Sequence, residues 1–183
     1  MLPTFIAIIV IVVAIILWII ATQRKLVVLD ENISNAMTQI GVQLSSRFDA
    51  LMPLLSLMKN YGEHESETLV ETIQSRRNTI TAKSTVDDVL RQEGIISEAL
   101  GRVAMLTEQY PELKENQTYI KTMDAVQIFE NMVRTSRLIY NDSVTKLNRE
   151  IRMFPVCVVA VMLGFRQRDY LADTAGTRKA NFI

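Results

Sequence analysis

The chain has 183 residues, with 20 basic and 20 acidic side chains, so its formal net charge is zero. A balanced chain has no long-range positive field that would gather nucleic acid or anionic lipid, and we expect no nucleic-acid partner. Glycine and proline are scarce, at 6 and 4, which favours an all-α fold. Cys157 is the only cysteine, which excludes an intramolecular disulfide and a multi-cysteine zinc site.

The N-terminal segment is predicted to be a transmembrane helix. Residues 5–21 read FIAIIVIVVAIILWIIA and are wholly apolar. A helix rises about 1.5 Å per residue, so roughly 20 residues cross a hydrocarbon core about 30 Å thick. Residues 1–25 then form an anchor with a basic flank, and its predicted partner is the lipid bilayer. The predicted membrane-spanning residues include Phe5, Ile9, Val13, Ile16, Trp18 and Ala21.

Two other readings of this segment are less consistent with the sequence. A cleaved signal peptide has a basic n-region and a small-residue cleavage site, but the N-terminus lacks Lys and Arg, and Ala21-Thr22-Gln23 is a poor cleavage signal. A lipoprotein would need a cysteine directly after the apolar run. We therefore expect a retained anchor.

Arg24 and Lys25 directly follow the span and predict its orientation. Because cytoplasmic flanks are enriched in Lys and Arg, the chain is predicted to be a single-pass protein of the inner (plasma) membrane with its remaining domain in the cytoplasm.

The residues after the anchor show helical periodicity. Apolar residues recur at steps of three and four from Leu26 to Met58, which marks one helix face. Within this helix Gly41 is irregular, and Pro53 is expected to introduce a kink. The further predictions are a helix from Glu63 towards Ile80, a capping box at Ser84–Asp87 opening a third helix that ends at Tyr110-Pro111, and a fourth helix starting near Asn116. Together they predict an antiparallel four-helix bundle over residues 26–153.

Two polar residues fall in the apolar register of the fourth helix. Glu130 and Arg137 occupy positions where the flanking members of the stripe are apolar. Such residues usually have partners inside a bundle, and we expect them to form a buried polar layer.

The C-terminal segment, residues 154–183, begins with an apolar run that is too short to cross a membrane. Four helices of alternating direction return the chain to the side of the anchor, so the run is predicted to be membrane-proximal. Its marker residues are Phe154, Val158, Val161, Leu163 and Phe165. The alternative, that the run caps the open end of its own bundle, is equally consistent with the sequence.

Three motifs resemble the LemA family: VQLSSRFDALMPLLSLMKNYGEHE within residues 32–77, EQYPELK at residues 108–114, and RLIYNDSVTKLNREIRMFP running into Gly164-Phe165. The resemblance covers nearly the whole chain after the anchor. It implies a bacterial membrane protein with an N-terminal anchor and an antiparallel helical bundle, and it implies no enzyme activity. Two positions depart from the family pattern: Ala36-Met37 stands where members often have Ala-Trp, and Gly41 replaces a frequent acidic residue.

No pattern in the sequence indicates a catalytic, cofactor or metal site. His64 shares a helix face with Glu67 and Glu71, but a dimetal site in a bundle needs Glu-x-x-His from two helices, and the second histidine is missing. A solvated acidic first turn is the favoured interpretation. Walker, dinucleotide-binding and kinase motifs are absent. Cys157 is interpreted as a small buried hydrophobe, with palmitoylation as the alternative.

A candidate partner-binding face consists of Tyr140, Asn141, Asn148 and Arg152, although surface and capping roles are favoured for these residues.

Two functions are consistent with the sequence as a whole. The first is a non-enzymatic, self-associating membrane scaffold that forms homo-oligomers and organises or shapes the membrane. The alternative is a membrane-tethered adaptor that presents a helical face to a signalling or protease partner.

Overall fold

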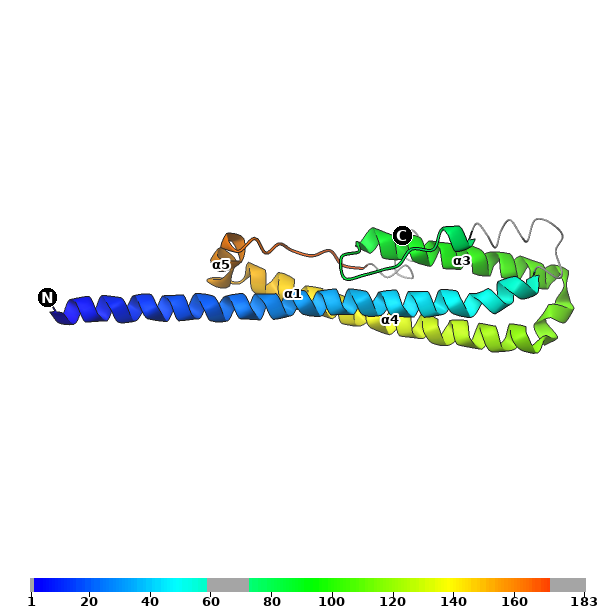
Figure 1. Ribbon diagram of the computed structural model, residues 1–183, viewed down its shortest axis with the longest axis horizontal. Helices are drawn as coiled ribbons and strands as arrows, with labels where there is room; N and C mark the ends of the chain where they lie inside the picture. The colour runs from blue at the N-terminus through cyan, green and yellow to red at the C-terminus, as the bar shows by residue number, and fades with distance from the viewer. Residues whose placement is uncertain (1, 59–72, 172–183) are drawn as a thin grey trace, which may run out of the picture. The chain divides into compact units, whose positions relative to one another are not determined.

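A computed structural model describes residues 2–58 and 73–171 of the chain. The helices are α1 (Leu2–Met58), α3 (Val86–Gln109), the 3-10 helix η1 (Pro111–Glu115), α4 (Gln117–Arg152) and α5 (Val156–Met162) (Figure 1). The described residues contain no strand, so the predicted all-α class is confirmed.

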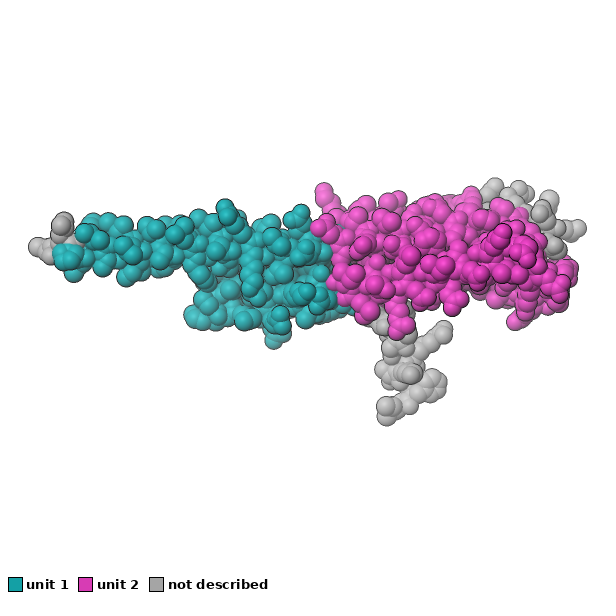
Figure 2. Space-filling view, turned by 90° about the horizontal axis from the view of Figure 1, so that it is seen from below, with its two compact units in different colours: residues 1–34, 140–183 teal, residues 35–139 magenta. Residues whose placement is uncertain are grey.

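The chain divides into two compact units, shown in different colours in Figure 2. Unit 1 comprises residues 1–34 and 140–183, and unit 2 comprises residues 35–139. The division cuts through both α1 and α4. The three domains expected from the sequence, 1–25, 26–153 and 154–183, stay a prediction.

Helix α1 joins the apolar segment to the first bundle helix without interruption. No helix-breaking residue lies between Gln23 and Leu26, and the helix also continues through Pro53. The predicted end of this helix at Asn60–Gly62 lies outside the described residues.

The apolar stripe of α1 was predicted with good accuracy. Its residues in unit 2 are buried at Met37, Ile40, Leu44, Phe48, Leu51 and Leu55. They share the core of this unit with Val89, Ile96 and Val103 of α3 and with Val126 and Val133 of α4. The unit is therefore held by side chains at helical spacing, each of which gains roughly 1.5–3 kcal/mol when it is fully buried.

Helix α3 begins with the predicted type of cap, but one residue later than predicted. The Thr85 hydroxyl accepts a hydrogen bond from the Asp88 backbone N–H at 3.2 Å, and the Asp88 carboxylate accepts one from the Thr85 backbone N–H at 2.9 Å. These bonds from the Thr85 backbone and hydroxyl hold the pKa of Asp88 below its ordinary value. The box is Thr85–Asp88 because its acidic member must occupy the third helical position, and Asp87 does not.

The predicted second helix is wrong at its C-terminal end. Residues 63–72 lie outside the described part, and residues 73–75 are helical, but the chain leaves the helix before it reaches Ile80. This stretch instead passes over α1 at Gly41, where Ile80 is buried.

The close approach at this crossing explains Gly41. A Cβ atom at position 41 would clash with the backbone carbonyl oxygen of Ile80 and lie only 3.0 Å from its carbonyl carbon. A backbone atom cannot rotate away as a flexible side chain can. The irregular glycine of the first bundle helix is therefore the residue that lets residues 77–80 pack on α1.

Gly41→Ala is expected to lower the melting temperature of the full chain in detergent, because the new methyl group forces the backbone at Ile80 away from α1. Gly94→Ala in α3 is the matched control, since a Cβ atom there meets nothing within 4 Å. Alanine is favoured over glycine in a helix interior by roughly 0.5–1 kcal/mol, so the control should be stabilised. Equal gains in both variants would contradict the crossing.

Candidate functional site

The functional geometry of unit 1 depends on where α4 ends beside α1. The Lys25 ammonium lies 2.8 Å from a carboxylate oxygen of Glu150, two residues before α4 ends at Arg152. Within this unit α4 runs antiparallel to α1 (Figure 1). The residues after Glu150 therefore continue past Lys25 towards the apolar segment of α1.

The apolar segment itself has the surface expected of a membrane-spanning helix. α1 is the one described helix that is long and apolar enough to cross a membrane, and none of its most apolar window is buried within the structure. The residues predicted to span the membrane all have exposed side chains: Phe5, Ile9, Val13, Ile16, Trp18 and Ala21. Burial on α1 begins at Thr22 and Leu26, next to the predicted topology residues Arg24 and Lys25.

Helix α5 carries two of the predicted membrane-proximal residues, Val158 and Val161, and lies beside α1 in Figure 1. Val159 and Ala160 are buried, so one face of α5 packs within unit 1. The other face presents Val158, Val161 and Met162, with Phe154 before the helix and Leu163 after it, and all five side chains are exposed. Phe165 is half-buried. An exposed apolar cluster of this kind usually marks an interaction surface.

The chain after α5 turns back along α4 and is held there by two asparagine side chains. Gly164 adopts a φ of 76°, a conformation that favours glycine, and begins this turn. The Asn148 amide donates to the Arg168 carbonyl and accepts from the Arg168 N–H, both at 2.9 Å. The Asn141 amide makes the same pair of bonds with Leu171, again at 2.9 Å. We call residues 166–171 the C-terminal strap.

Three further contacts hold the strap. The Tyr140 hydroxyl donates to the Asp169 carbonyl at 3.1 Å, and the Arg168 guanidinium donates to the Asp30 carboxylate at 2.9 and 3.2 Å. Leu171 is almost fully buried. Burial of the Tyr140 phenol raises its pKa above the ordinary value, because the phenolate would lose its hydration.

The strap accounts for most of the predicted partner-binding face. Tyr140, Asn141 and Asn148 bind the chain's own backbone, whereas Arg152 stays exposed. Two asparagines seven residues apart lie on one helix face, and each side-chain amide offers the same donor and acceptor as a peptide group. That spacing is the signal from which this site could have been found.

The predicted polar layer consists of two separate ion pairs within unit 2. Arg137 is buried and lies 3.1 Å from Glu93 of α3, which is itself largely buried. Glu130 is exposed, and one of its carboxylate oxygens lies 3.0 Å from the largely buried guanidinium of Arg47 on α1. The partners Glu93 and Arg47 were not identified from the sequence, because each lies on a different helix and periodicity does not show which residues face one another.

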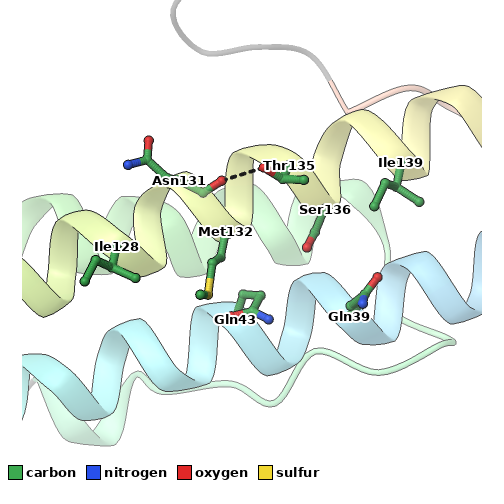
Figure 3. A pocket seen from close by; sticks show the side chains of 8 residues that line it. All are labelled: Gln39, Gln43, Ile128, Asn131, Met132, Thr135, Ser136 and Ile139. Atoms are coloured by element: carbon green, nitrogen blue, oxygen red, sulfur yellow. Dashed lines mark hydrogen bonds between the residues drawn. The ribbon is translucent and has the colours of Figure 1, made fainter.

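Unit 2 also has an open groove between α1 and α4 (Figure 3). The groove has a volume of about 510 Å³, and charged side chains are absent from its lining. The lining residues are Gln39 and Gln43 of α1 and Ile128, Asn131, Met132, Thr135, Ser136 and Ile139 of α4. Among the residues that the structure describes, no group of three His, Cys, Asp or Glu side chains could hold a metal ion. His64, Glu67 and Glu71 lie outside those residues.

Comparison with known proteins identifies the family. The LemA family model matches residues 36–182. This chain belongs to the LemA family.

Relatives among characterised proteins are distant. Magnetosome protein MamQ 1 and magnetosome protein MamQ 2 of Paramagnetospirillum magneticum are both 31% identical over 85 residues, which is 46% of this chain and 31% of each relative. Magnetosome protein MamQ of Magnetospirillum gryphiswaldense is 22% identical over 157 residues, covering 72% of this chain and 58% of the relative. The chain thus spans about a third to somewhat over half of the length of these relatives.

The third LemA-like motif coincides with the strap contacts. It contains Tyr140, Asn141 and Asn148, which bind residues 168–171, and it leads into Gly164, where the chain turns. In this chain, these three polar residues of the motif bind the chain's own C-terminal backbone.

Asn148→Ala is expected to accelerate hydrogen exchange at the Arg168 amide by about tenfold, because it removes two hydrogen bonds that each contribute roughly 0.5–1.5 kcal/mol. Asn141→Ala should act in the same way on the Leu171 amide, so each variant serves as the control for the other. Asn131→Ala, elsewhere on α4, should change neither amide. Unchanged exchange at Arg168 in Asn148→Ala would contradict the role given to this side chain.

Proposed function

We propose that this LemA-family chain is a non-enzymatic, membrane-anchored helical scaffold that self-associates. The observation that carries the proposal is the surface of α1. Exposed apolar side chains surround its N-terminal part, and from Leu26 onward a single stripe is buried in the core. A helix that is apolar all round requires lipid or protein around it, whereas one with a single apolar stripe belongs to a bundle in water.

The bundle is placed in the cytoplasm in this proposal, at the inner membrane of a bacterium. Its support is the basic pair Arg24 and Lys25 beside an N-terminus that carries no charged side chain. An impermeant thiol reagent applied to intact cells distinguishes the two orientations.

The groove of unit 2 is the proposed surface for a second copy. It combines apolar Ile128, Met132 and Ile139, which are between 44% and 54% exposed, with the uncharged hydrogen-bonding groups of Gln39 and Gln43. Amide side chains can donate and accept at once, so two copies of this surface can bind each other without like-charge repulsion.

Membrane anchoring also favours a second copy of the chain as the partner of the groove. Copies held by α1 in one bilayer are confined to two dimensions with the same orientation, which raises the effective concentration of the groove for another copy. The relatives MamQ 1 and MamQ 2 are named magnetosome proteins, and for this chain we propose a structural part in a membrane-bound assembly.

A tethered adaptor is the alternative, because the same uncharged groove would also receive a helix of another protein. The adaptor needs no intrinsic oligomer. The mass of the purified particle therefore separates the two functions.

The full chain in mild detergent is expected to have a protein mass that is a multiple of its 20.8 kDa monomer mass, measured by light scattering on a sizing column. Ile128→Glu combined with Met132→Glu should reduce that mass to the monomer, because it introduces like charges into both copies of the groove. The control is Met105→Glu with Ile120→Glu, at exposed apolar positions outside the groove, and it should remain oligomeric.

A monomeric wild-type chain would overturn the scaffold and favour the adaptor. A control pair that dissociates as fully as the groove pair would show that the groove is not the contact surface.

A further inference from the structure

A second hollow in the structure lies in unit 1, at the end of α4. It has a volume of about 390 Å³ and is lined by Thr145, Asn148, Arg149, Arg152, Met153 and Tyr170. We propose that this hollow binds the phosphate of an anionic lipid headgroup. The inference rests on the proposed anchoring of α1 and adds a ligand class and a site to it.

The first support is the charge of unit 1, which is positive although the chain as a whole has no net charge. The described residues of unit 1 carry seven basic side chains and five acidic ones. Three of these acids already have basic partners: Glu150 pairs with Lys25, Asp30 with Arg168, and Asp142 with Lys146. The described residues of the unit therefore keep a basic excess after these pairs are formed.

The two arginines of the hollow belong to that excess. Arg149 and Arg152 are exposed, and neither makes an ion pair with another residue that the structure describes. A guanidinium presents a planar fork of N–H donors that matches two phosphate oxygens at once. Two such forks beside the hydroxyl group of Tyr170 form a suitable set of donors for a phosphate, whereas the Thr145 hydroxyl already donates to the Asn141 carbonyl at 2.8 Å.

The second support is the position of the hollow relative to the end of the predicted membrane span. Lys25 lies four residues after Ala21, the end of the apolar run, and it binds Glu150. The two arginines lie one residue before and two residues after Glu150. Along α4 a residue advances about 1.5 Å, so both guanidinium groups belong to the turn that lies beside the end of the span. Headgroup phosphates occupy this zone at the edge of the hydrocarbon core.

The third support distinguishes a lipid from a free phosphate. Met153 lines the hollow, and the next residue, Phe154, begins the exposed apolar cluster that continues through Val158 and Val161. A headgroup in the hollow would thus have its acyl chains beside an apolar surface, whereas a free phosphate gains nothing from that surface. A zwitterionic headgroup carries its own cation next to the phosphate and should bind less well.

The test is native mass spectrometry of the full chain in mild detergent with equal amounts of phosphatidylglycerol and phosphatidylcholine. We expect the wild-type chain to retain phosphatidylglycerol about tenfold better, because two uncompensated basic residues face the phosphate. Arg149→Gln with Arg152→Gln should remove this preference. Arg149→Lys with Arg152→Lys keeps the charge but loses the forks, so it should retain only part of the preference.

The matched control is Lys121→Gln with Arg134→Gln, which removes the same charge from exposed positions of α4 in unit 2. It should keep the full preference, and a loss equal to that of the arginine pair would overturn the site in favour of diffuse electrostatic attraction. Equal retention of both lipids by the wild-type chain, or displacement of phosphatidylglycerol by millimolar inorganic phosphate, would also overturn it. None of these lipid-binding results depends on the mass of the particle. Failure of the lipid site can therefore be distinguished from failure of the proposed scaffold, which the particle mass tests.

Discussion

The ion pair between Lys25 and Glu150 is the contact on which the functional account depends. It marks the point along α1 at which α4 ends, and hence where the residues after α4 lie relative to the apolar span. A half-exposed ion pair of this kind contributes little energy by itself, so its importance is geometric. The buried side chains Leu26, Leu147 and Ile151 of the same unit hold the two helices together and keep this register.

Polar side chains of unit 1 also hold the C-terminal strap by satisfying its backbone hydrogen-bonding groups. An extended backbone cannot satisfy its own N–H and C=O groups, and leaving them unpaired near a helix would be costly. Asn141 and Asn148 satisfy two peptide groups with four hydrogen bonds, and Leu171 adds a buried apolar contact. The strap thereby fixes Tyr170 at the edge of the hollow that also contains Arg149 and Arg152.

The sequence predicted what depends on periodicity and local chemistry, and it failed where packing between distant residues decides. The apolar stripe of α1, the start of α4 and the apolar span follow from the order of residues along a helix. Arg47 and Glu93 were missed because the partner of a polar residue depends on which helix faces it. The departure of residues 77–80 from helix was missed because it depends on the glycine at position 41 of another element. The candidate face at Asn141 and Asn148 was seen, but its ligand, the chain's own backbone, required the structure.

We propose that α5 lies at the cytoplasmic membrane surface beside the anchor, and the accessibility of single cysteines to a reagent tests this placement. With Cys157 replaced by serine, one cysteine is placed at Thr4, Lys83 or Val158, and a membrane-impermeant maleimide is applied. Only the Thr4 variant is expected to react in intact cells. In inverted membrane vesicles the Lys83 variant should react rapidly, whereas the Val158 variant should react slowly until detergent is added. Reaction of the Val158 variant as fast as the Lys83 variant in undissolved vesicles would show that α5 faces water, and reaction of the Lys83 variant in intact cells would reverse the orientation.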